Sequence, residues 1–148
     1  MYTNQYKFKY LEWYSPEEIH DTTLKWQSEL EFVEVEWNFL KELLSDHTLL
    51  LLSETNFDKT RKLISKLTGY KTKTTELKKL LEEHRNALEV LVDDINELQK
   101  EKAFKERHLL LELKIQDFHD NYRNIKNSIF DIMKESFKKR KQKTLLGK

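Results

Sequence analysis

Histidine and carboxylate side chains are the residues of this 148-residue chain that come closest to forming a chemical site. If the chain folds back on itself near residues 52 and 101, then His20, His84 and His119 reach the same height in a helical fold. Carboxylates lie close to these histidines in the sequence, namely Glu17, Glu83 and Asp117. Imidazole and carboxylate ligands together suit zinc, iron or manganese. These three histidines are therefore the candidate metal ligands.

A structural role for the histidines is the competing interpretation, and the sequence favours it. Dimetal helical bundles use two Glu-x-x-His pairs, whereas this chain has only one, Glu17 with His20. The other histidines lie on or beside apolar stripes, where polar residues commonly set the register of a bundle. We therefore expect no bound metal and no cofactor.

Other catalytic patterns are missing from the sequence. There is no cysteine, which excludes thiolate nucleophiles and disulfides. Glycine occurs only at positions 69 and 147, so no glycine-rich phosphate-binding loop can form. Adjacent carboxylates such as Glu82 and Glu83 diverge on a helix. The expectation is a protein that is not an enzyme.

The composition limits the possible fold classes and the possible cellular locations of the chain. Hydrophobic residues make up 38% of the chain, which is enough for the core of one domain, and two glycines and one proline leave few tight turns. This balance predicts a few long helices. The longest apolar run, Leu49 to Leu52, is too short to span a bilayer, and the N-terminus has no secretory layout. We expect a soluble, cytoplasmic protein with no membrane insertion.

The first helix has a well-defined predicted start. Ser15 and Glu18 have the spacing of a capping box, and Pro16 occupies the first helical position. Tyr14 and Ile19 are placed to form a hydrophobic staple around this start.

Three apolar stripes follow, with steps that alternate between three and four residues as in left-handed helical bundles. The first stripe is Ile19, Thr23, Trp26, Leu30, Val33, Trp37, Leu40, Leu44 and His47. The second is Leu63, Leu67, Tyr70, Thr74, Leu77, Leu81, His84, Leu88, Leu91, Ile95 and Leu98. The third is Phe104, His108, Leu111, Ile115, Phe118, Tyr122, Ile125, Ile129 and Ile132.

The predicted fold is all-α, an elongated antiparallel three-helix bundle with an aromatic-rich N-terminal arm. Its shape resembles a spectrin repeat in architecture, not in sequence motif. We expect an arm over residues 1–14, one domain over 15–138 with helices at about 15–50, 56–98 and 103–138, and a basic tail over 139–148. A single helix that continues through residues 99–102 is the alternative to a turn there.

The first helix carries more apolar surface than one bundle buries. A second column beside the core stripe contains Phe32, Val35, Phe39 and Leu43. These side chains either complete the core of one chain or contact the N-terminal arm, a protein partner or a second copy of the chain. We favour a non-enzymatic interaction or scaffold module that binds a protein partner or itself, with a homodimer as one outcome.

The basic C-terminal segment supplies the alternative function. Residues 134–148 carry a net charge of +6, although the whole chain carries only +1. The cluster Lys138, Lys139, Arg140, Lys141 and Lys143 offers binding to nucleic acid, or to an anionic membrane surface. The competing interpretation is a solvated helix end, because cations there interact favourably with the helix dipole. Metal binding by a helical bundle is the third functional hypothesis.

Overall fold

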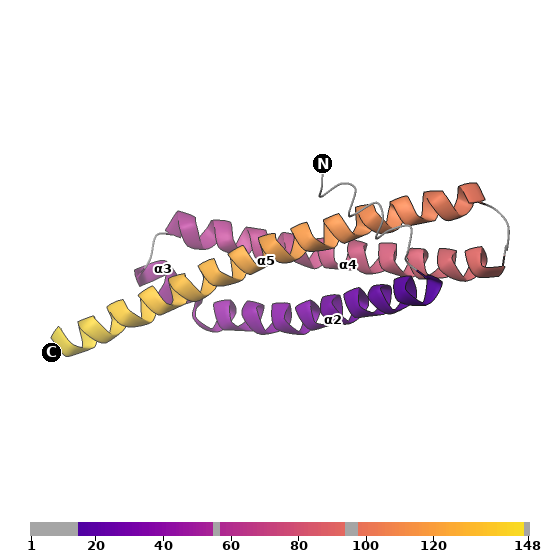
Figure 1. Cartoon of the computed structure of the whole chain (residues 1–148). Coiled ribbons are helices and arrows are strands. Elements are labelled where there is room, and N and C mark those ends of the chain that lie inside the picture. Colours follow the sequence, from indigo (N-terminus) through magenta and orange to yellow (C-terminus); the bar gives the residue numbers. More distant parts are fainter. Residues whose placement is uncertain (1–14, 55–56, 94–97, 147–148) are drawn as a thin grey trace, which may run out of the picture. The chain divides into compact units, whose positions relative to one another are not determined.

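The computed structural model describes residues 15–54, 57–93 and 98–146, and the fold within these ranges is all-helical (Figure 1). Four helices are present in the described ranges: α2 (Pro16–Asp46), α3 (Thr48–Glu54), α4 (Phe57–Asp93) and α5 (Leu98–Leu146). Only Ser15 and His47 of the described residues lie outside a helix. The predicted N-terminal arm, residues 1–14, lies outside the described residues.

The chain divides into two compact units. Unit 1 combines the described residues of 1–31 and 75–118, and unit 2 combines those of 32–74 and 119–148. Each unit therefore contains one segment of α2, one of α4 and one of α5, and unit 2 also contains α3.

The predicted apolar stripes form the buried core of both units. Every stripe residue from Ile19 to Leu44 is buried, as is every one from Leu63 to Leu88. The third stripe is buried at all positions except the half-buried Ile125. His47 and Leu91 are half-buried, and the side chains of Ile95 and Leu98 lie outside the described residues. The three-four spacing thus identified the core-facing side of each helix.

Side-chain contacts set the helix directions inside unit 1. His84 of α4 contacts His108 of α5, and Ile19 of α2 packs in one cluster with Leu88 and Phe104. The pairs His84–His108 and Leu88–Phe104 place α4 antiparallel to α5. Ile19 of α2 packs with Phe104, and Trp26 stacks on His108, so the α2 and α5 segments of unit 1 run in the same direction.

Trp37 of α2 makes several of the contacts that hold unit 2 together. The buried indole Nε1–H donates a hydrogen bond to the backbone carbonyl of Leu67 in α4. Lys41 and Lys71 lie over the same ring, 5.5 and 5.2 Å from its centre. Tyr70 of α4 in turn meets Tyr122 of α5, with ring centres 5.8 Å apart. Aromatic side chains therefore connect all three long helices in this unit.

The start of α2 is the predicted capping box. The Glu18 backbone N–H donates to Ser15 Oγ over 3.1 Å, and the Ser15 N–H donates to the Glu18 carboxylate over 3.4 Å. These reciprocal bonds satisfy two of the donors that a helix N-terminus leaves without intrahelical partners.

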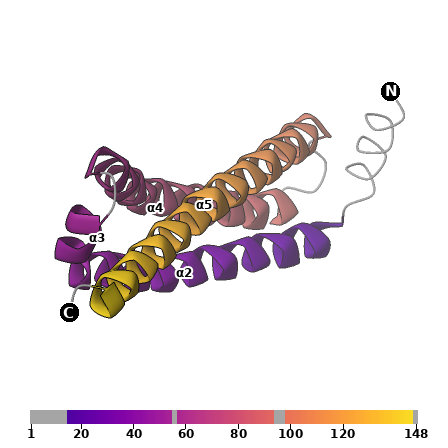
Figure 2. The same cartoon turned by 90° about the vertical axis from the view of Figure 1, so that its left-hand side faces the viewer.

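The helix ends differ from the predicted ones. The first predicted helix divides at His47, where Figure 2 shows α3 turning away from the line of α2. His47 Nδ1 donates to the Leu43 carbonyl over 2.9 Å, and the Thr48 hydroxyl donates to the Leu44 carbonyl over 2.8 Å. Side-chain donors thus occupy carbonyls at the point where the regular helix ends.

The third long helix begins earlier and ends later than predicted. It starts at Leu98, so residues 99–102, expected to form a turn, are helical, and it continues through the predicted tail to Leu146. The alternative of one continuous helix is wrong, because His84 and His108 are in contact. Twenty-four residues of uninterrupted helix would separate them by about 36 Å.

Candidate interaction surface

An exposed apolar stripe runs along the unit 2 segment of α2. The exposed fractions are 63% for Phe32, 69% for Val35 and 56% for Phe39, while Leu43 is half-buried. Their spacing of three and four residues places them on one side of the helix. The structure therefore does not bury the first three of these predicted contact residues in the core.

The neighbouring helix α5 extends this stripe. Lys126 of α5 makes an ion pair with Glu36 of α2 at 3.2 Å, and the ring of Phe137 meets His47 edge-on at 5.1 Å. Phe130 lies between Lys126 and Phe137 on the same flank of α5, because these positions are four and seven residues apart. Phe130 is 43% exposed.

On α2, two residues of the exposed apolar stripe lie between the two residues that contact α5. Glu36, Phe39, Leu43 and His47 are three and four residues apart, so Phe39 and Leu43 lie on the flank whose ends contact α5. We call Phe32, Val35, Phe39, Leu43 and Phe130 the aromatic face of unit 2. Unlike the four α2 residues, Phe130 was not predicted as part of the site. Its exposure on a helix flank depends on how α2 and α5 pair, which the sequence did not give.

The structure brings His84 together with His108, and not with the His20 and His119 of the metal hypothesis. Within the buried part of unit 1, His84 Nε2 and His108 Nδ1 are 2.9 Å apart, and one of these nitrogens donates to the other. The ring of Phe104 stacks on His84 at 4.4 Å, and Trp26 stacks on His108 at 4.9 Å. His108, which the metal hypothesis left out, is thus the partner of His84.

Burial decides the protonation of this pair. The pKa of His108 is lowered to about 4 by burial alone, and the pKa of His84 is lowered to about 4 mainly by burial, with smaller contributions from the neighbouring His108 and Arg107. Two neutral imidazoles therefore share a hydrogen bond at neutral pH. His20 and His119 are half-buried, and within the described ranges no three His, Asp or Glu side chains group as metal ligands.

The basic cluster of α5 is helical and exposed. Lys138, Lys139, Arg140, Lys141 and Lys143 all lie on the helix that ends at Leu146, at the yellow end in Figure 1. Four consecutive positions, 138–141, point in four directions around a helix, so the cations do not form one strip. Lys139 also pairs with Glu135 at 3.2 Å.

Comparisons with protein-family models, with curated proteins and with solved structures find no match to this chain. Within the described ranges, no helix is both long enough and apolar enough to cross a membrane.

Proposed function

We propose that this chain is a non-enzymatic helical interaction module whose aromatic face binds a second copy of the chain. The observation that carries the proposal is the exposure of Phe32, Val35 and Phe39 on one side of α2. Large apolar side chains gathered on an exposed surface typically mark a protein interface. The finer architecture that we propose is an elongated antiparallel three-helix bundle, preceded by an aromatic arm at residues 1–14.

A second copy fits this face for a geometric reason. Two copies related by a two-fold axis bring the same patch together, so the patch must be complementary to itself. The stripe from Phe32 to Leu43 spans about 16 Å of helix and has an aromatic ring in each half. When it meets its own copy in the opposite direction, each ring faces aliphatic or aromatic surface.

The energy available is sufficient to matter. A Phe side chain that is about 60% exposed leaves on the order of 100 Å² of apolar surface in water, which corresponds to roughly 2.5 kcal/mol if it is buried. Two such rings from each protomer contribute on the order of 10 kcal/mol before the costs of association are subtracted.

The double variant Phe32→Ser/Phe39→Ser tests this proposal. We expect dissociation at least 100-fold easier by sedimentation equilibrium, with the helical circular-dichroism signal unchanged. Leu24→Ser/Leu113→Ser is the control, because those side chains are also exposed, at 40% and 44%, but lie in unit 1 and outside the aromatic face. Equal weakening by both pairs would contradict the proposal, as would unfolding caused by the Phe pair.

A further inference from the structure

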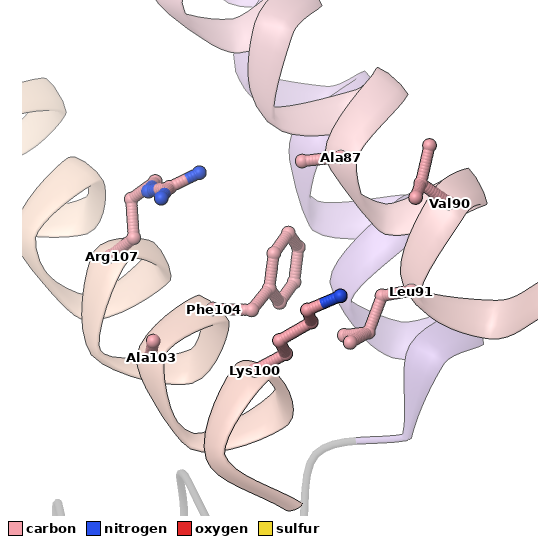
Figure 3. A pocket seen from close by; sticks show the side chains of 7 residues that line it. All are labelled: Ala87, Val90, Leu91, Lys100, Ala103, Phe104 and Arg107. Atoms are coloured by element: carbon pink, nitrogen blue, oxygen red, sulfur yellow. The ribbon is translucent and has the colours of Figure 1, made fainter. Parts of the chain in front are cut away.

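A second surface lies in unit 1, along the seam between α4 and α5, and the proposed dimer face does not use it. Two adjoining hollows of about 310 and 300 Å³ open there, and Arg107 lines both of them. Figure 3 shows the first hollow, with the ring of Phe104 between the two helices and Lys100 and Arg107 on either side of it.

The shape of the seam follows from which residues flank it. Ala87 of α4 and Ala103 of α5 both line the first hollow, and their short side chains leave it open above Phe104. Val90 and Leu110 add apolar walls that are 62% and 60% exposed. The result is an apolar groove, and its floor is formed by core residues.

The α5 wall of the groove carries a regular series of cations. Lys100, Arg107 and Lys114 are seven residues apart, so all three lie on the same flank and project along the groove over about 21 Å. Glu83 is the one acidic side chain among the residues that line the two hollows. Within the described ranges, Arg107 and Lys114 form no ion pair with a carboxylate.

We propose that this groove binds an acidic amphipathic helix of a partner protein. Helices enter apolar grooves with anchor residues three, four and seven positions apart. Side chains that flank such a seam at seven-residue intervals pair with opposite charges on the incoming helix. A partner helix with Leu anchors and a Glu at every seventh position matches both the apolar floor and the spacing of the cations.

The probe is a designed 18-residue helical peptide with Leu anchors and Glu at seven-residue intervals, labelled for fluorescence anisotropy. Its matched partner carries Lys in place of each Glu. The full chain should bind the acidic peptide at least tenfold more tightly than the basic one, and the difference should shrink with added salt. Equal affinities, or no binding, would overturn the proposal.

Charge reversal makes the test specific for the groove. In Arg107→Glu/Lys114→Glu both changed side chains are exposed, and the preference should invert so that the basic peptide binds more tightly. The control Lys102→Glu/Lys138→Glu makes the same change in net charge at exposed positions outside the groove and should leave the preference intact. If both variants shift the affinities equally, the effect is one of net charge and the groove assignment fails.

Two other occupants give different results in the same assay. The groove would be assigned to an anionic lipid if oleate displaced the acidic peptide and if the chain bound the acidic and the basic peptide equally well. The other comparison uses a peptide of residues 16–31, whose exposed acidic side chains include Glu17, Asp21 and Glu31. If this peptide binds more tightly than the designed one, the occupant of the groove is a second copy of the chain and not a partner protein.

Discussion

Acidification tests the buried histidine pair more directly than any substitution. In the unfolded chain His84 and His108 have the ordinary histidine pKa of about 6.5, whereas burial lowers both pKa values to about 4 in the folded protein. Between these values the unfolded chain binds protons that the folded protein does not. The free energy of unfolding therefore falls as the pH falls from about 6.5 to about 4, and the pair causes no pH dependence above that window.

The magnitude follows from the width of the window. At pH 5 the unfolded rings lie about 1.5 pH units below their pKa, which is worth roughly 2 kcal/mol for each histidine. Both rings are almost fully buried, at 1% and 0% exposure, so solvent does little to reduce the effect. The pair should therefore lower the free energy of unfolding by roughly 4 kcal/mol between pH 7 and pH 5.

Urea unfolding at pH 7, 6 and 5 measures this loss, and a double variant isolates it from the other titrating groups. His84→Leu/His108→Leu keeps similar side-chain volumes and retains the stacking surfaces of Phe104 and Trp26. The variant should lose roughly 4 kcal/mol less than the parent over this pH range. Parallel pH profiles for the two proteins would show that the rings are not buried as a neutral pair, and would refute the reasoning.

Two further predictions concern helix stability, and both are measured as shifts in the urea midpoint at pH 7. Ser15→Ala removes the acceptor of the Glu18 N–H and should destabilise the protein by about 1 kcal/mol, whereas an unchanged midpoint would show that the capping box contributes nothing. Gly69→Ala should stabilise the protein by about 1 kcal/mol, because the added methyl group meets no atom within 4 Å inside α4. A loss of stability at this position would indicate strain that the open surroundings do not explain.

The core was predictable because the pattern that defines it is local. A buried helix face repeats every three or four residues, so positions such as Leu30, Leu81 and Ile129 could be identified without knowing what packs against them. The capping box at Ser15 and Glu18 was predictable for the same reason, since both partners lie within one turn.

The histidine site was only partly predictable because it depends on where the chain turns. No glycine or proline marks the end of α4, and this helix ends at Asp93, five residues before its predicted end at residue 98. In an antiparallel pair of helices, misplacing the turn by one residue shifts the residue that lies opposite a given position by two. His84 was accordingly matched with residues near 118 instead of with His108. The sequence Asp93-Asp94-Ile95-Asn96 held the missed signal, because Asp and Asn favour helix ends.

The two candidate surfaces were likewise predictable only where they depend on one helix alone. The apolar surplus on α2 was visible in the sequence as a second column beside the core stripe. Phe130 and the groove cations were not, because their positions follow from the pairing of α5 with α2 and with α4.

Sedimentation equilibrium of the untagged 148-residue chain over a wide range of concentrations, at low and high salt, tests the central claim most directly. An interface made by the aromatic face is apolar, so we predict a dimer that persists at 1 M NaCl, where surface charges are screened within about 3 Å. A monomer at every concentration would contradict the account, and so would a dimer that dissociates as salt is added.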